Sequence, residues 1–143
     1  MADLALCGRS SKFNLAYTQA GLTPDAGTTF LLPRMLGLKR TMELLLLNRA
    51  LPAEEALSWG LVNEVVADEQ LLARALEVAE KLASGASAAF GATKRLIAHS
   101  LGALESQMVL ESETIARHAV GEEGKEGVSA FLDKRTAHFP HRD

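Results

Sequence analysis

The sequence has 143 residues, 48% of them hydrophobic and 23% charged, with a formal net charge of −3 and an isoelectric point of about 5.8. This composition is typical of one globular domain with a core and excludes a disordered or fibrous protein. The acidic balance disfavours nucleic acid as a partner, and no apolar run reaches the length that spans a membrane. The single cysteine cannot form an internal disulfide, and no signal peptide is recognisable, so we expect a cytoplasmic protein.

The first part of the chain predicts two short strands separated by a turn. Residues 2–7 are mostly apolar and contain no helix breaker, which favours a strand. Residues 8–11 carry turn chemistry, and residues 12–15 alternate in polarity as a second strand would. The glycine-, proline- and threonine-rich segment at 21–29 then precedes a change to helical periodicity.

From residue 30 onward the sequence predicts mostly helix. A short helix is expected over 30–36, where Pro33 would bend or end its first part. Residues 38–47 are apolar on nearly every side, which predicts a buried helix. Asp68 is interpreted as the N-cap of the helix over 69–84. The remaining elements are expected to be a helix from Pro52 to Gly60, a strand over 61–66, and helices over 86–100, 104–120 and around 128–132.

These elements do not make a satisfactory complete domain. A two-stranded β unit is marginally stable, and its open edges would pair with something else. The helices after Leu38 are too apolar to pack only on one another and on a hairpin. The residues alone therefore indicate either a fragment or an obligate partner of other chains. The four histidines show no metal-ligand spacing, so we expect no metal site.

Several segments together resemble the enoyl-CoA hydratase/isomerase (crotonase) superfamily. They are, in family order, GLTPDAGTTFLLPRMLG at 21–37, TMELLLLNRALPAEEALSWGLVNEVV at 41–66, ATKRLI at 92–97 and EGVSAFLDKRTAHF at 126–139. The similarity covers essentially the whole chain and looks like the C-terminal half of a protein about twice as long. Within the superfamily, the Gly-x-x-Pro-Asp pattern is closest to the ring 1,2-epoxyphenylacetyl-CoA isomerase branch.

The resemblance implies an α/β fold, namely the C-terminal part of a spiral of β-β-α units followed by a helical oligomerisation region, mostly helical in this chain. Residues 1–66 would end the spiral core and carry the active-site loop, and residues 67–143 would form the C-terminal helical region. The implied substrate is an acyl-CoA thioester with no separate cofactor, and the implied assembly is a homotrimer or hexamer. The family stabilises an enolate with two backbone N–H groups from upstream glycine-rich segments, and no segment of this chain matches them.

Asp25 is the candidate catalytic residue. From the residues alone it is either the N-cap of the following helix or an acid–base group. The resemblance favours catalysis and implies an isomerase, because Tyr17 stands where hydratases carry a glutamate. Hydration needs paired carboxylates, whereas one carboxylate is enough to shift a double bond, or to attack an aryl carbon. The alternatives are a hydratase that takes its other carboxylate from outside this chain, and a non-catalytic assembly or binding fragment.

Three side chains near Asp25 are candidate contacts for the acyl group. Tyr17 would line the acyl pocket or pack beside a strand end. Leu22 and Phe30 would form the wall of that pocket or belong to the core.

Basic residues near the C-terminus are candidate contacts for coenzyme A. The resemblance implies that Lys134 and Arg135 meet its phosphates, while the alternative is a solvated basic tail that balances the acidic residues at 122–126. Phe131 and Phe139 would contact the adenine or a neighbouring subunit, or pack in the core.

Overall fold

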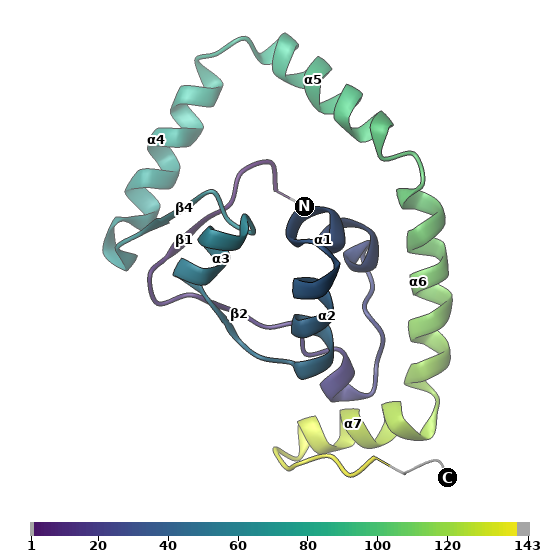
Figure 1. Ribbon diagram of the computed structural model, residues 1–143. Helices are drawn as coiled ribbons and strands as arrows, with labels where there is room; N and C mark the ends of the chain where they lie inside the picture. The colour runs from purple at the N-terminus through teal and green to yellow at the C-terminus, as the bar shows by residue number, and fades with distance from the viewer. Residues whose placement is uncertain (1, 140–143) are drawn as a thin grey trace. The chain divides into compact units, whose positions relative to one another are not determined.

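The computed structural model describes residues 2–139 (Figure 1). These residues divide into two compact units. The first unit contains Leu51–Ala103 together with the N-terminal residues up to Phe13. The second contains Asn14–Ala50 together with the residues from Leu104 onward. Within the described range, no helix combines the length and the apolar character needed to cross a membrane.

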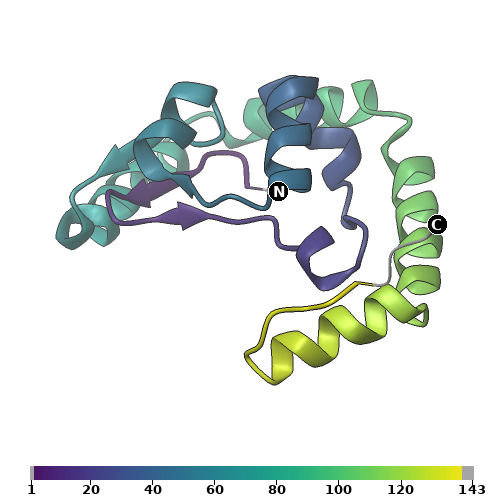
Figure 2. The same cartoon turned by 60° about the horizontal axis from the view of Figure 1, so that its bottom comes forward.

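Four short strands in the described part of the first unit form two separate pairs. The N-terminal segment that carries β1 and β2 is purple in Figure 2. β1 (Leu6–Gly8) runs parallel to β4 (Glu64–Val66), and β2 (Lys12–Phe13) runs antiparallel to β3 (Leu51–Pro52). The expectation of a hairpin between the first two strands is therefore wrong. The reason is long-range pairing: both strands find partners far along the chain instead of pairing with each other across the turn.

The first unit also contains three helices and a 3-10 turn. α3 (Ala53–Trp59) ends at Gly60 in the left-handed conformation, which agrees with the prediction from sequence. Asp68 begins the 3-10 turn η2 (Asp68–Gln70) without capping a helix, because its Oδ1 accepts hydrogen bonds from the N–H and the hydroxyl of Ser10. The N-cap interpretation of Asp68 is therefore wrong. The other two helices of this unit are α4 (Leu71–Ala83) and α5 (Ser87–Ser100).

The second unit is helical, and its core lies where α1 (Thr28–Leu36) packs on α2 (Leu38–Leu47). α1 begins before residue 30 and continues past Pro33, so this proline does not end the helix. The predicted burial of α2 on nearly all sides is wrong within the described residues. Thr41, Leu44 and Leu45 are buried, but Leu47 is 72% exposed, because α1 covers only one face of α2.

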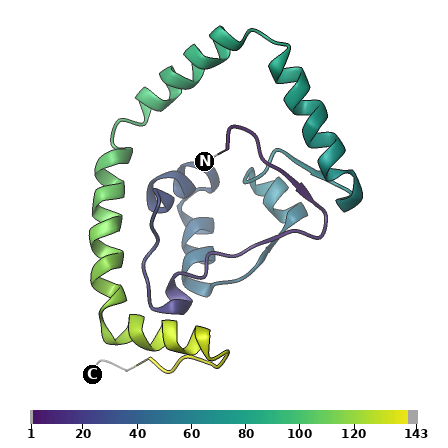
Figure 3. The same cartoon turned by 180° about the vertical axis from the view of Figure 1, so that it is seen from behind.

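Two further helices and a 3-10 turn complete the second unit. α6 (Leu104–Ala119) packs on α1, and α7 (Glu122–Leu132) packs on α6 and on η1 (Thr18–Ala20) (Figure 3). The contact between η1 and α7 is made by backbone, because a Cβ added at Gly127 would clash with the main chain of Ala20. This close approach holds the segment before residue 25 against the C-terminal helix.

Candidate active site

The turn between η1 and α1 has an unusual backbone path. Gly21, Ala26 and Gly27 all have positive φ, at 68°, 53° and 77°. A left-handed alanine is strained, so the surrounding structure has to hold Ala26 in place. Pro24 is buried within the same turn. Asp25 therefore lies on a tight loop whose shape is determined by its surroundings.

The side chain of Asp25 does not cap α1. The N-cap position belongs to Gly27, which has no side chain to make a capping bond, and the backbone carbonyl of Asp25 accepts the Thr28 N–H at 2.9 Å. Oδ1 of Asp25 instead accepts a hydrogen bond of 2.8 Å from Oη of Tyr17. The interpretation of Asp25 as a helix cap is thus wrong, because the carboxylate is bound to a side chain from the preceding element.

Tyr17 and Asp25 form a half-buried pair of a phenol and a carboxylate. Burial raises the pKa of the Tyr17 phenol, and the hydrogen bond to Asp25 and the charge of its carboxylate raise this pKa further. The phenol therefore remains a protonated donor at neutral pH. It holds one carboxylate oxygen of Asp25 by a side-chain hydrogen bond.

A third polar side chain, which the sequence patterns did not predict, contacts this turn. Glu111 of α6 is only 4% exposed, and its carboxylate accepts the N–H groups of Gly27 at 2.6 Å and Thr29 at 2.9 Å. The hydroxyl of Thr29 also donates to Glu111 and accepts from Nε2 of Gln107 at 2.6 Å. A signal was present in the sequence, because Glu111 lies seven residues after Leu104, on the apolar side of its helix.

The two apolar candidates near Asp25 occupy different environments. Leu22 is half-buried, and its N–H donates to the carbonyl of Tyr17 at 3.0 Å. Phe30 is 7% exposed and lies under the guanidinium of Arg34, 3.5 Å from the ring centroid. Arg34 also donates from Nη1 to the Phe30 carbonyl. Their contact with an acyl group remains a prediction.

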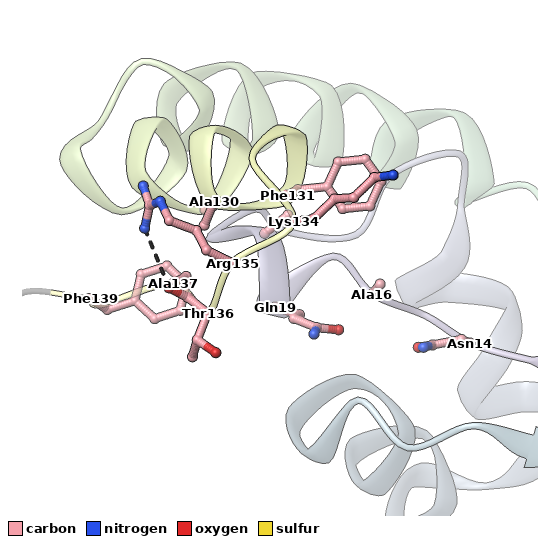
Figure 4. Close-up of a pocket in the computed structure, with 12 residues that line it drawn as sticks. Asn14, Ala16, Gln19, Ala130, Phe131, Lys134, Arg135, Thr136, Ala137 and Phe139 are labelled. Carbon is pink, nitrogen blue, oxygen red and sulfur yellow. Dashed lines mark hydrogen bonds between the residues drawn. The ribbon is translucent and has the colours of Figure 1, made fainter.

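Lys134 and Arg135 lie together at a cavity of about 760 Å³ in the second unit (Figure 4). Asp25, Tyr17, Leu22 and Phe30 are not among its lining residues, so the structure divides the predicted site residues into two groups. The lining residues are Asn14, Ala16, Gln19, Ala20, Gly127, Ala130, Phe131, Lys134, Arg135, Thr136, Ala137 and Phe139.

The two basic residues of this cavity differ in their partners. Arg135 donates to both carboxylate oxygens of Glu126, at 2.6 and 2.9 Å, and the backbone N–H of His138 donates to the same carboxylate. The Arg135 guanidinium, with help from the His138 N–H, lowers the pKa of Glu126 to about 2. Lys134 is exposed, and its backbone φ is 53°. Arg135 is thus engaged in holding the C-terminal segment, and contact of either residue with a phosphate remains a prediction.

Comparison with known proteins agrees with this architecture. A family model described as enoyl-CoA hydratase/isomerase matches residues 1–142. The chain is 39% identical to the 1,2-epoxyphenylacetyl-CoA isomerase of Escherichia coli K12, over 96% of this chain and 53% of that protein. It is also 39% identical to a probable enoyl-CoA hydratase of Rhodobacter capsulatus, over 99% of this chain and 55% of that protein.

Solved structures extend the similarity to three dimensions. A crystal structure of an enoyl-CoA hydratase/isomerase from Pseudoalteromonas atlantica T6c superposes with a TM-score of 0.90 at 37% identity, over 97% of this chain and 56% of that one. An enoyl-CoA hydratase from Mycobacterium avium subsp. paratuberculosis K-10 superposes with a TM-score of 0.92 at 35% identity. The chain spans about half the length of these relatives. The expected fold class, a mostly helical α/β chain of the crotonase type, is confirmed, and the chain belongs to the enoyl-CoA hydratase/isomerase family.

Proposed function

We propose that this chain carries the acid–base carboxylate of an acyl-CoA isomerase, and that Asp25 is that group. The observation that carries the proposal is the pairing of Asp25 with Tyr17 at 2.8 Å, in place of a bond to a helix terminus. A carboxylate held by one oxygen keeps its other oxygen for a substrate proton. The names of relatives, which include an isomerase and a hydratase that act on CoA thioesters, support the substrate class.

The reaction requires one proton to move between two carbon atoms. Asp25 takes a proton from a carbon made acidic by the thioester, and the C–H electron pair shifts towards the carbonyl oxygen as an enolate forms. The carboxylic acid then returns the proton to a different carbon, the enolate collapses, and the double bond has moved with no net gain or loss of atoms. Donors aimed at the enolate oxygen are also needed, and the family resemblance assigns them to glycine-rich segments that this chain does not match.

A proton shuttle of this kind needs only one carboxylate, so the presence of a single candidate carboxylate favours isomerisation over hydration. Addition of water requires one group to orient the water and another to deliver a proton. The family resemblance places Tyr17 at the position of one hydratase glutamate, and its raised pKa keeps it a neutral donor. Hydration remains the second candidate, because a probable enoyl-CoA hydratase is similar at the same 39% identity.

The cavity beside α7 is the proposed contact for coenzyme A. Lys134 offers an exposed ammonium at its edge, and Phe131 and Phe139 offer aromatic surface for a base. Arg135 is proposed to shape this cavity through its ion pair with Glu126. Its contact with phosphate is proposed to be weaker than that of Lys134. The proposed substrate thus has its thioester near Asp25 and its phosphates near Lys134.

We also propose that the working protein is a homo-oligomer, a trimer or a hexamer. Large apolar side chains are exposed on α4, α5 and α6, including Leu72 at 73% and Leu96 at 73%. Apolar surface of this extent has to be covered, by further copies or by more of the same protein. Light scattering of the intact protein measures the number of copies, and a monomeric mass would contradict this part of the proposal.

The replacement Asp25→Asn in the intact protein tests the proposed reaction. Asparagine has the same size and can still accept from Tyr17, but it cannot carry the substrate proton. We expect double-bond isomerisation of an enoyl-CoA to fall by about 100- to 10,000-fold, with acyl-CoA binding retained by titration calorimetry. Asp3→Asn makes the same chemical change at an exposed ion pair with Lys94 and should leave turnover unchanged.

Unchanged isomerisation in Asp25→Asn would overturn the assignment of Asp25. The choice between the two reactions comes from the unmodified protein. Loss of enoyl absorbance with crotonyl-CoA, with no double-bond shift on any enoyl-CoA tested, would establish the hydratase in place of the isomerase.

A further inference from the structure

Glu111 is a buried carboxylate whose two oxygens both face the turn that follows Asp25. Oε2 accepts the Gly27 N–H at 2.6 Å, and Oε1 accepts the Thr29 N–H at 2.9 Å together with the Thr29 hydroxyl. The side chain comes from α6, more than eighty residues further along the chain. A carboxyl group at 4% exposure is costly unless it is hydrogen-bonded, and both oxygens of Glu111 accept hydrogen bonds here.

The turn is only partly held by its own backbone. The Thr28 N–H donates to the carbonyl of Asp25, but the N-cap Gly27 makes no side-chain cap bond, and the N–H groups of Gly27 and Thr29 have their acceptors elsewhere. Ala26 and Gly27 are both left-handed, which is a strained path for alanine. Glu111 supplies the missing acceptors and places a negative charge at the positive end of α1.

Neighbouring side chains on the same face of α6 as Glu111 also pack against the turn and the start of α1. A Cβ at Gly27 would meet side chains of Leu104 and Met108, which lie on the same side of α6 as Glu111. Nε2 of Gln107 donates at 2.6 Å to the Thr29 hydroxyl, which in turn donates to Glu111. Four residues on one face of α6 therefore contact the turn and the first residues of α1.

We propose that Glu111 is a positioning residue for Asp25. It fixes the backbone directly after Asp25, while Tyr17 fixes the carboxylate itself. The two contacts together determine where the free oxygen of Asp25 lies. The proposal rests on the proposed role of Asp25 as the proton carrier, and it predicts that Glu111 acts on the rate through Asp25 without touching substrate.

Glu111→Gln in the intact protein tests this role. Glutamine keeps the shape but turns an NH₂ towards an N–H donor of Gly27 or Thr29, so the turn loses part of its anchor. We expect kcat to fall on the order of 100-fold because the carboxylate is displaced, with KM for the acyl-CoA nearly unchanged. Glu113→Gln makes the same change at an exposed position on α6 and should keep the kcat of the wild type.

A double-mutant cycle separates positioning from general stability. If Glu111 acts through Asp25, Glu111→Gln causes no further loss of residual activity in an Asp25→Asn background. Losses that multiply in the double variant would overturn the proposal, as would an unchanged kcat in Glu111→Gln. Amide hydrogen exchange at Gly27 and Thr29 should accelerate in Glu111→Gln while exchange in α7 stays slow, and unchanged exchange at both amides would contradict the anchor.

A second variant covers the case in which Glu111→Gln fails to fold. Thr29→Val keeps the size of the side chain and removes the hydroxyl that links Gln107 to Glu111. We expect a smaller fall in kcat than for Glu111→Gln, and Thr29→Ser should recover most of it. No difference between the valine and serine variants would count against the proposal. A failure of the proposed function is distinguishable, because it appears as full activity in Asp25→Asn itself.

Discussion

Tyr17 donates a hydrogen bond from Oη to Oδ1 of Asp25 across 2.8 Å, between residues eight positions apart. The 3-10 turn η1, which ends at left-handed Gly21, brings the two side chains together. The contact occupies one oxygen of the carboxylate, and the proposed reaction uses the other. The N-cap of α1 is Gly27, two residues further along the chain, so Asp25 does not cap that helix.

The Tyr17–Asp25 contact can be tested by titrating the tyrosine. Tyr17 is the only tyrosine in this sequence, so its ionisation can be followed by ultraviolet absorbance. Its pKa is raised first by burial and then by Asp25, and a neighbouring negative charge disfavours the phenolate. We expect Asp25→Asn to lower the pKa of Tyr17 while leaving it above the ordinary value of 10.0, because the burial remains. An unchanged pKa would mean that the two groups do not interact.

Tyr17→Phe provides the complementary measurement on activity. Phenylalanine keeps the ring and removes only the donor to Asp25. We expect kcat to fall about tenfold, the equivalent of one lost charge-assisted hydrogen bond, with the fold retained by circular dichroism. Turnover equal to that of the wild type would show that Tyr17 serves only to pack beside the turn.

The close contact between η1 and α7 predicts opposite effects of alanine at two glycines. A Cβ at Gly127 would lie closer to the main chain of Ala20 than real Cβ atoms come, so Gly127→Ala should lower the free energy of unfolding by about 1–3 kcal/mol. Gly91 lies within α5, where the nearest group to an added Cβ is Nη1 of Arg95 at 3.5 Å. Gly91→Ala should therefore raise the free energy of unfolding by about 1 kcal/mol.

Urea unfolding of the two glycine variants measures both changes. They are matched because each replaces a helical glycine by alanine, and only the packing around the glycine differs. Equal shifts of the midpoint in the same direction would contradict the close approach of α7 to η1.

The ion pair between Glu126 and Arg135 predicts an acid-sensitive C-terminal segment. Arg135 lowers the pKa of Glu126 from 4.5 to about 2, so the folded state holds this proton less tightly than the unfolded state. The pair then stabilises the fold above pH 4.5 and loses its contribution as the pH falls from 4.5 towards 2. The protection factors of the amides in residues 133–139, which compare each exchange rate with its intrinsic rate at the same pH, should fall over that range.

Glu126→Gln should abolish this acid sensitivity. Glutamine keeps the size of the side chain and removes the titrating charge, so the protection factors of the segment become low and nearly independent of pH. Glu122→Gln, at an exposed residue paired with Lys125 across 3.5 Å, is the matched control and should keep the response of the wild type. The same pH response in Glu126→Gln would place the acid-sensitive group elsewhere.

Lys134 predicts a salt-dependent contribution to coenzyme A affinity. Lys134→Ala should raise the Kd for an acyl-CoA by about three- to tenfold, because an exposed ammonium facing a phosphate contributes on the order of 1 kcal/mol. Added salt should reduce the difference between variant and wild type. Lys125→Ala, which removes the same charge from α7 beside Glu122, should leave the Kd unchanged. Equal losses in both variants would indicate a general effect of net charge.

Sequence patterns predicted most of the helices but not the strand partners. The helices around residues 38–47, 69–84 and 104–120 were found because a period of 3.6 is local and survives in any tertiary setting. The pairing of Cys7 with Val65 was not found, since register between distant strands depends on the path of the intervening chain.

In the candidate site, too, the sequence predicted what is local and did not predict what depends on tertiary packing. Asp25 stood out because an acidic residue in a Gly-x-x-Pro turn is visible locally and matches a family pattern. Its hydrogen bond to Tyr17 and the anchoring of the turn by Glu111 depend on how η1 and α6 pack around residues 21–29. Asp68 shows the same limit, because a short polar side chain before a helix can cap it or bind Ser10 from far away.

The sequence by itself determined the family, the helical character of the chain and the identity of the candidate carboxylate, because periodicity and motifs are properties of neighbouring residues. The tertiary structure decided what that carboxylate touches. Tyr17 donates a hydrogen bond to Asp25, and Glu111 accepts one from the turn that follows Asp25. Arg135 forms an ion pair with Glu126. Each of these pairings is a hydrogen bond of about 3 Å or less, a range that only folding brings about for residues separated along the chain.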